Sequence, residues 1–126
     1  MRIDKAQPAG PVVNGLSRAG FKVDDAQGVT GVYPALLLTP VRADAWEPPA
    51  IEALDLAALA PILTPAPEFV LLGTGAELRH PPRALVRALE AMGIGVEAMD
   101  SRAAARAWGV LRSEDRQIAA ALFPLI

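Results

Sequence analysis

The sequence predicts an α/β fold, and three consecutive segments carry that prediction. Residues 69–72 are an unbroken apolar run that leads into Gly73-Thr74-Gly75, which is how a buried central strand ends at the carboxyl edge of a parallel sheet. Residues 82–92 carry apolar side chains at helical spacing, and residues 94–99 have the pattern of another strand. Strand, helix and strand within about thirty residues form a right-handed βαβ unit.

The N-terminal part of the chain predicts an antiparallel hairpin that follows an arm. Residues 1–19 are broken by Pro and Gly, so we expect an extended arm along the surface and a single domain over residues 20–126. Residues 20–23 alternate apolar and polar side chains, and an Asp-Asp turn separates them from a second strand region at residues 29–39. Pro34 lacks an N–H and is expected at an edge or a bulge.

The middle of the chain predicts one short helix between loops. Residues 40–49 have the composition of a loop, with Trp46 as its anchor. Residues 52–60 predict a short helix that ends near Pro61. Residues 64–67 predict an extended lead-in to the central strand.

Caps and breakers set the limits of the later helices. Pro82 fits the first position of a helix, and Gly93 fits the position just after its end. The apolar stripe of that helix consists of Leu85, Ala88, Leu89 and Met92. Asp100 or Ser101 caps the next helix, which is expected to run to about Leu111. The sequence pattern alone does not decide whether residues 116–123 form a helix or a strand. Three alanines favour a helix, and the short length before Pro124 favours a strand.

Composition indicates one globular domain without a cofactor. The chain has 126 residues, of which 52% are hydrophobic and 21% charged, with a net charge of -2; this excludes a strongly basic nucleic-acid binder. It has no Cys and one His, His80, so we expect no disulfide, metal or cofactor, and the usual nucleophiles and proton carriers are scarce. Neither a signal sequence nor an apolar run of about 18 residues is present, and we expect a soluble cytoplasmic protein.

The glycine loop after the central strand is the first candidate ligand site. Backbone N–H groups of Gly73, Thr74 and Gly75 could face a small anion. However, no P-loop Lys and no third glycine of a dinucleotide fingerprint follow. The alternative is a tight strand exit where a Cβ atom would clash.

Three polar residues complete that candidate site if strands 69–73 and 94–99 are neighbours. Asp100, Ser101 and Arg116 would then converge at the carboxyl edge, where α/β proteins bind ligands. The alternative is that Asp100 caps a helix and Arg116 pairs with it or with loop carbonyls.

Several of these motifs together resemble one small family of single α/β domains. The resemblance lies in Leu72-Gly73-Thr74-Gly75, in Gly93-Ile94-Gly95-Val96-Glu97, in Met99-Asp100-Ser101, and in Arg116 with Ala119-Ala120-Ala121-Leu122. Bacterial and archaeal members are mostly uncharacterised. Animal members include a mitochondrial factor for assembly of respiratory complex I and an adipogenesis-associated domain protein.

The resemblance implies a three-layer domain around a mixed five-stranded sheet whose last strand is antiparallel to the others. Residues 118–123 would then be that buried strand. Family members usually carry Thr at the position of Ser101 and Gly at the position of Asp115. They usually carry an aromatic residue followed by Asn where this chain has Trp108-Gly109.

Two classes of function remain at this stage. The first, which the resemblance implies, is a non-catalytic interaction module that binds another protein, with a link to assembly of respiratory complex I. We expect it to be a monomer or a weak homodimer that reaches a membrane only through its partner. The alternative is a small-anion or small-molecule binder or enzyme with a cleft at Gly73–Gly75, Asp100 and Arg116.

Overall fold

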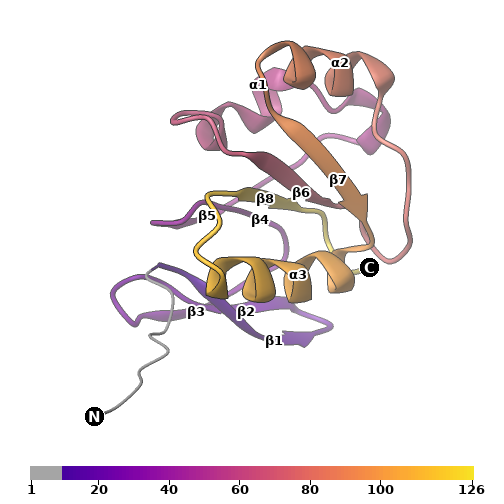
Figure 1. The fold of residues 1–126 in the computed structure, drawn as a ribbon. Coiled ribbons are helices and arrows are strands. Elements are labelled where there is room, and N and C mark those ends of the chain that lie inside the picture. Colours follow the sequence, from indigo (N-terminus) through magenta and orange to yellow (C-terminus); the bar gives the residue numbers. More distant parts are fainter. Residues whose placement is uncertain (1–9) are drawn as a thin grey trace.

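The protein is built in three layers, with a five-stranded sheet in the middle (Figure 1). The computed structural model describes residues 10–126. Short helices α1 (Leu56–Leu59) and α2 (Arg83–Ala91) cover one face of the sheet, and α3 (Ser101–Ser113) lies on the other face together with a small three-stranded sheet. The strands of the large sheet, in the order β5-β4-β8-β6-β7, are β5 (Ala43–Ala45), β4 (Leu36–Leu38), β8 (Ala119–Leu122), β6 (Phe69–Gly73) and β7 (Gly95–Met99).

The central strand β6 contributes to apolar cores on both faces of the large sheet. Val70 and Leu72 pack into the core under α1 and α2, and Leu71 packs into the core under α3 and the small sheet. Side chains of a strand alternate between faces, so a strand that is covered on both sides must be apolar throughout. The predicted buried strand and the βαβ unit are therefore confirmed.

The last strand, β8, lies in the middle of the sheet and runs in the same direction as β6. Its pairing with β4 is antiparallel, with Leu36 opposite Leu122, but its pairing with β6 is parallel, with Val70 opposite Ala119. The resemblance implied a last strand antiparallel to the others, and this holds only towards β4. The physical reason is the crossover: α3 carries the chain from the end of β7 back along the sheet, which makes β8 parallel to β7 and β6.

The small sheet consists of β1 (Val12–Ser17), β2 (Gly20–Asp24) and β3 (Thr30–Tyr33). The hairpin of β2 and β3 is confirmed, whereas residues 12–17, which the sequence placed in an arm, pair along β2. The part of that arm before residue 10 lies outside the described residues.

The predicted strand region at residues 29–39 divides between the two sheets. Its first part forms β3, and after Pro34 the chain enters β4 in the large sheet.

A hydrogen bond joins the start of β1 to α3. The Nε1–H of Trp108 on α3 donates to the carbonyl of Pro11 at 3.1 Å, which fixes the start of β1 against the helix.

The middle of the chain is more broken than the sequence pattern suggests. Residues 43–45, expected in a loop, form the edge strand β5. The expected helix over residues 52–60 is three pieces, namely a 3₁₀ turn at Ile51–Ala53, the helix α1, and a 3₁₀ turn at Ala60–Ile62. Asp55 causes the first break, because its backbone is extended and its side chain caps α1. The ring of Trp46 meets that of Phe123 edge-on at 5.2 Å, so Trp46 anchors this region as expected.

The two later helices follow the sequence closely. α2 begins after Pro82, and α3 begins after Asp100 and runs two residues further than expected, to Ser113. Leu85 and Leu89 of α2 are buried, but Met92 lies beyond the helix end and is exposed. The predicted stripe was wrong at that position because the helix stops before the next turn can bring Met92 to the core.

Candidate functional site

The backbone N–H groups of the glycine loop are used within the protein. The N–H of Thr74 donates to the carbonyl of Met99 at 2.8 Å. The N–H of Gly75 donates to Oγ of Ser101, also at 2.8 Å. Both donors that an anion would need at this strand end are therefore already engaged.

Ser101 joins the carboxyl ends of β6 and β8 to the start of α3. Its hydroxyl is fully buried, accepts the N–H of Gly75 and donates to the carbonyl of Phe123 at 2.8 Å. Gly73 packs directly against it: a Cβ on Gly73 would lie 2.8 Å from Cδ2 of Leu122 and 2.9 Å from Oγ of Ser101. These contacts support the tight strand exit, where only glycine fits without displacement.

Thr74 fixes the loop that follows the strand. Its hydroxyl donates to the carbonyl of Glu77 at 2.7 Å and accepts the N–H of Arg79 at 2.9 Å. Asp100 acts as a helix cap, since its Oδ1 accepts the N–H of Ala103 at 2.9 Å. Of the six candidate residues, the structure brings five to this edge, and their polar atoms serve the fold.

Arg116, the sixth candidate residue, lies at the opposite end of the sheet. Its Nε and Nη2 donate to Oε1 of Glu68 at 3.0 and 2.8 Å, and its guanidinium lies 5.6 Å from the ring centre of Phe69. Because β8 is parallel to β6, the residue before β8 must lie near the start of β6 and not near its end. The expected convergence of Arg116 with Asp100 and Ser101 was wrong.

The pairing of Glu68 with Arg116 perturbs both groups. Hydrogen bonds from the Arg116 side chain and from the N–H of Gln117 lower the pKa of Glu68 below its ordinary value, and the carboxylate raises the pKa of Arg116. The side chains of Arg116 and Glu68 are 40% and 45% exposed, and ion pairs at the surface stabilise a fold only modestly.

A shallow hollow lies at the carboxyl edge, beside the glycine loop. It has a volume of about 460 Å³. Its lining residues are Thr74, Gly75, Ala76, Glu77, Arg79, Phe123, Pro124 and Ile126. Arg79 is paired with Glu52, while Ile126 and the adjacent Leu78 are 85% and 54% exposed. The hollow is lined by both polar and apolar side chains.

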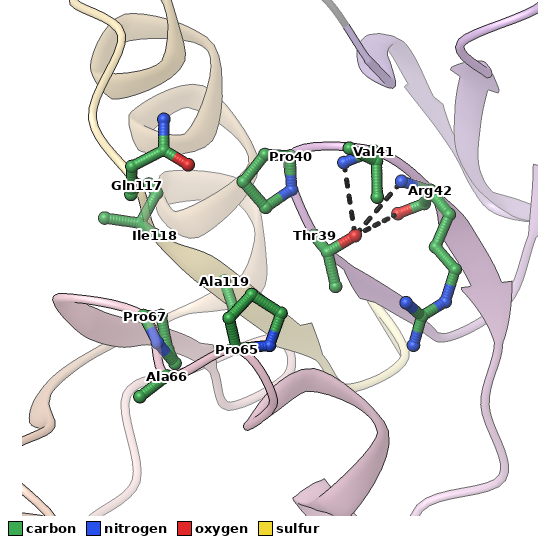
Figure 2. Close-up of a pocket in the computed structure, with 10 residues that line it drawn as sticks. All are labelled: Thr39, Pro40, Val41, Arg42, Pro65, Ala66, Pro67, Gln117, Ile118 and Ala119. Carbon is green, nitrogen blue, oxygen red and sulfur yellow. Dashed lines mark hydrogen bonds between the residues drawn. The ribbon is translucent and has the colours of Figure 1, made fainter.

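A smaller pocket opens at the other end of the sheet, between the turn after β4 and the segment before β6 (Figure 2). Its volume is about 140 Å³, comparable to cavities that hold one small apolar group. The lining residues are Thr39, Pro40, Val41, Arg42, Pro65, Ala66, Pro67, Gln117, Ile118 and Ala119. Sequence reasoning missed this pocket, although three prolines in two segments indicated backbone that does not pair as a strand.

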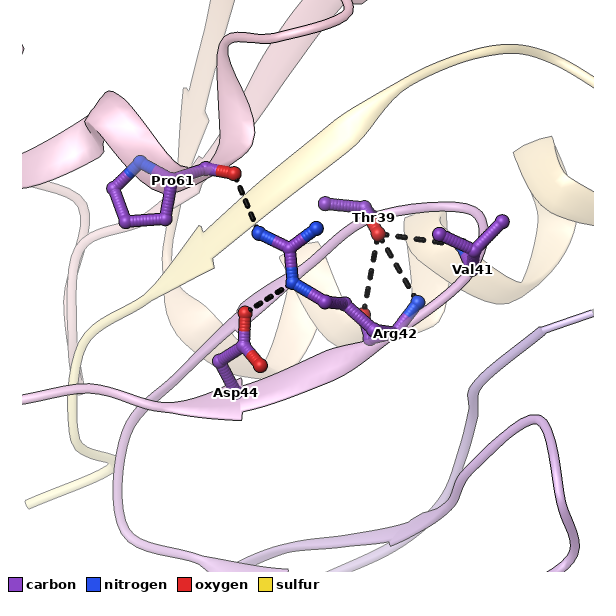
Figure 3. Close-up of polar contacts among 5 residues, drawn as sticks. All are labelled: Thr39, Val41, Arg42, Asp44 and Pro61. Carbon is purple, nitrogen blue, oxygen red and sulfur yellow. Dashed lines mark hydrogen bonds and ion pairs between the residues drawn. The ribbon is translucent and has the colours of Figure 1, made fainter.

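The polar groups around that smaller pocket are also bonded internally (Figure 3). Oγ1 of Thr39 accepts the N–H groups of Val41 and Arg42 at 3.2 and 3.1 Å. The guanidinium of Arg42 donates from Nε to Asp44 and from Nη2 to the carbonyl of Pro61, both at 2.6 Å. The pocket therefore offers an apolar recess and a rigid turn, and no charged group is directed into it for chemistry.

The described residues lack two features that would point to particular classes of protein. Within residues 10–126, no three His, Cys, Asp or Glu side chains are grouped as metal ligands would be. In the same part of the chain, no helix has the length and apolar character to cross a membrane.

The protein is a small three-layer α/β domain. At both ends of its five-stranded sheet, the polar groups described above form hydrogen bonds within the protein. The chain belongs to the family described as "Protein of unknown function (DUF498/DUF598)", whose model matches residues 13–123. Among solved structures, a protein from Bordetella parapertussis is 32% identical, with a TM-score of 0.76 over 92% of this chain and 97% of that one. An NMR structure of a Bordetella pertussis protein described as an Mth938-like domain is 25% identical, with a TM-score of 0.74 over 99% and 92%.

Two curated proteins give the sequence relationships. An uncharacterized protein of Rhodobacter capsulatus is 44% identical over 71 residues, which span 56% of this chain and 56% of that protein. The NADH dehydrogenase [ubiquinone] 1 alpha subcomplex assembly factor 3 of Danio rerio is 32% identical over 126 residues, which span 97% of this chain and 69% of that factor. The chain is thus similar to an assembly factor along nearly all of its length.

Proposed function

We propose that this domain is a non-catalytic module that binds another protein during assembly of a membrane-bound NADH dehydrogenase. The observation that carries the proposal is the similarity to the Danio rerio assembly factor over 97% of this chain. The proposal includes a cytoplasmic location and a contact with the membrane that depends on the partner.

The carboxyl edge supports binding of a protein surface more than binding of a small anion. The N–H groups of Thr74 and Gly75 have internal acceptors, and Asp100 caps a helix. An anion site would need free donors here, and Arg116 is at the far end of the sheet. The small-molecule alternative therefore loses the geometry on which it depended.

Exposed apolar side chains at the same edge favour a protein partner. Ile126 lines the hollow, Leu78 lies in the sequence between the lining residues Glu77 and Arg79, and both are largely open to solvent. Apolar residues that gather around a hollow mark interaction surfaces more often than isolated ones do. Burying them against a partner would add favourable apolar contact without disturbing the hydrogen bonds below.

The test is co-purification from native membranes and cytosol, with surface variants as controls. The tagged full chain should recover a subunit of the NADH dehydrogenase, and deletion of its gene should lower the amount of assembled enzyme. Leu78→Glu with Ile126→Glu should weaken recovery, whereas Val110→Glu, an exposed residue on α3, should leave it unchanged. A reproducible turnover that disappears in Asp100→Ala, with no protein recovered, would overturn the proposal.

A further inference from the structure

The outer edge of β7 is the longest uninterrupted strand edge without a partner in residues 10–126. β7 ends the five-stranded sheet, and none of the described strands pairs with its outer side (Figure 1). Its five residues contain neither Pro nor a bulge. By contrast, β5 at the opposite edge has three residues, β3 has four, and the pairing of β1 shifts between Val13 and Gly15.

The hydrogen bonds to β6 determine which backbone groups of β7 point outward. The N–H of Gly95 donates to Glu68 at 3.2 Å, and the carbonyl of Met99 accepts from Thr74 at 2.8 Å. Parallel strands bond through every second residue, so the groups that face β6 belong to Gly95, Glu97 and Met99. Val96 and Ala98 therefore each direct one donor and one acceptor away from the sheet.

Glu97 stands between those two outward residues and has no partner within the described part of the chain. Its side chain is exposed, and it forms no hydrogen bond or ion pair with residues 10–126. It pairs in register with Leu71, which places it on the side of the sheet that carries α3. An added strand would meet this carboxylate before any other charge of β7.

The position of Glu97 disfavours pairing of β7 with a second copy of itself. A symmetric antiparallel pair that uses Val96 and Ala98 of both copies has its two-fold axis at Glu97. The two carboxylates would then face each other in a pair without hydrogen bonds, about 4.5 Å apart at Cα, and like charges directly opposite are destabilising.

Shifted symmetric registers gain no hydrogen bonds over the register centred on Glu97. An axis at Val96 would require the N–H of Ile94, which already donates to Leu89 at 2.9 Å. An axis at Ala98 would require a strand conformation on both sides of Asp100, which instead caps α3. A different chain that places a cation opposite Glu97 can use Val96 and Ala98 without the charge repulsion of the symmetric pair.

We propose that the outer edge of β7 binds an extended segment of a partner protein that places a Lys or Arg opposite Glu97. Main-chain hydrogen bonds to Val96 and Ala98 supply the pairing, and the opposite charge supplies the selectivity. This inference rests on the proposed function, because it adds a main-chain contact at β7 to the side-chain contacts of Leu78 and Ile126 that hold the assembly partner.

Purified protein and synthetic peptides test the edge directly. The probes are Thr-Thr-Val-Lys-Val-Thr-Thr and the same peptide with a central Glu, titrated against ¹⁵N-labelled protein. The Lys peptide should shift the amide signals of Val96 and Ala98 and bind about five-fold more tightly than the Glu peptide. Glu97→Lys should reverse that preference. Failure of both peptides to shift these two amides would overturn the inference.

Two matched variants separate the edge from the rest of the molecule. Ala98→Pro removes an outward N–H without removing a bond to β6, and Ala98→Thr keeps that N–H. Peptide binding should be lost in the first and kept in the second. If Ala98→Pro fails to fold, the reversed peptide preference of Glu97→Lys still tests whether the peptide binds at β7.

Self-association gives an independent check by analytical ultracentrifugation. Glu97→Thr removes the repulsion and should dimerise more strongly than the native chain. A native chain that is itself a dimer through β7 would overturn the inference in favour of a second copy. Dimerisation of Glu97→Thr without any Lys-peptide binding would also overturn it, because Glu97 would then only protect the edge.

Co-purification distinguishes failure of this inference from failure of the proposed function. If the native chain, Ala98→Pro and Glu97→Lys all recover the same partner, the edge is not the binding site and the proposed function stands. If the peptides bind as expected but the native chain recovers no subunit of the NADH dehydrogenase, the inference about β7 is supported and the proposed function is contradicted.

Discussion

At the scale of single residues, Asp115 has a backbone conformation that favours glycine. Its φ is 59°, and the family that the sequence resembles usually carries Gly at this position. A left-handed conformation costs most residues about 1–2 kcal/mol and costs Asp less, because its short polar side chain tolerates this region. The only ion pair of the Asp115 side chain within the described residues is a long one, 3.9 Å to Arg112, and the side chain is exposed.

Asp115→Gly is therefore expected to raise the free energy of unfolding by up to about 1 kcal/mol. Urea denaturation measures the change. Glu114→Gly is the matched control, because Glu114 has an ordinary φ of -94° and should gain nothing. Equal effects of the two substitutions would remove the conformational explanation.

Gly73 and Gly109 offer opposite tests of the same substitution. A Cβ on Gly73 would meet Leu122 and Ser101 at 3.0 Å or less, whereas a Cβ on Gly109 would meet nothing within 4 Å. Gly73→Ala should lower the free energy of unfolding by about 1–3 kcal/mol through overpacking. Gly109→Ala should raise it by up to about 1 kcal/mol, because alanine favours a helix interior. A neutral Gly73→Ala variant would argue against the tight strand exit.

The contact between Glu68 and Arg116 should make stability depend on pH. Hydrogen bonds from Arg116 and Gln117 lower the pKa of Glu68 in the folded state. Its contribution is therefore complete above the ordinary pKa of a glutamate, about 4.3, and is lost as the pH falls through the lower folded value. The difference in Tm between the native chain and Glu68→Gln should shrink as the pH decreases from 6 to 3.

At the scale of elements, the sequence predicted those whose limits are set by strong local signals. The apolar run of β6, the proline before α2 and the Asp100 cap of α3 each determine a boundary on their own. β5 was missed because three residues, Ala-Asp-Ala, carry neither alternation nor β propensity. β8 is rich in alanine and was assigned as a strand only through the family resemblance, because burial between β4 and β6 overrides its helix propensity.

Only part of the candidate site could be predicted from the sequence, because local sequence patterns do not determine the direction of a strand. Gly73–Gly75, Asp100 and Ser101 follow adjacent parallel strands, so the sequence could place them at one edge. Arg116 precedes β8, and its location depends on whether β8 runs with or against β6. An antiparallel β8 would have put Arg116 near Gly73; the parallel one puts it about 13 Å away along the strand, since each residue rises about 3.3 Å.

β8 itself gives a prediction at this scale. It separates β4 from β6 and pairs with both, so truncation after Asp115 should expose two strand edges and leave an aggregating protein. Light scattering and size-exclusion chromatography measure the outcome. Truncation after Leu125, which leaves every strand intact and removes only the exposed Ile126, is the control. A monomeric, cooperatively melting product of the longer truncation would show that β8 is dispensable.

At the scale of the whole molecule, the two sheets share one of the two apolar cores. Phe21 and Val23 of the small sheet pack with Leu71 and Leu122 of the large sheet and with Trp108 of α3. A three-stranded sheet needs a covered hydrophobic face to be stable in water, and the small sheet has its apolar face in this shared core. We therefore propose that the described part of the chain folds as one cooperative unit.

Phe21→Ala tests that cooperativity, because Phe21 is fully buried where the two sheets meet. Loss of a buried phenylalanine side chain should lower the free energy of unfolding by about 3–5 kcal/mol, a large part of a typical total of about 5–15 kcal/mol. Val32→Ala, an exposed position on β3, should change it by less than about 0.5 kcal/mol. Hydrogen exchange and circular dichroism should report the same midpoint for both sheets. If the amides of β2 exchange in a separate, earlier step while β6 keeps its native stability, the small sheet is an independent unit that is merely docked on the large one.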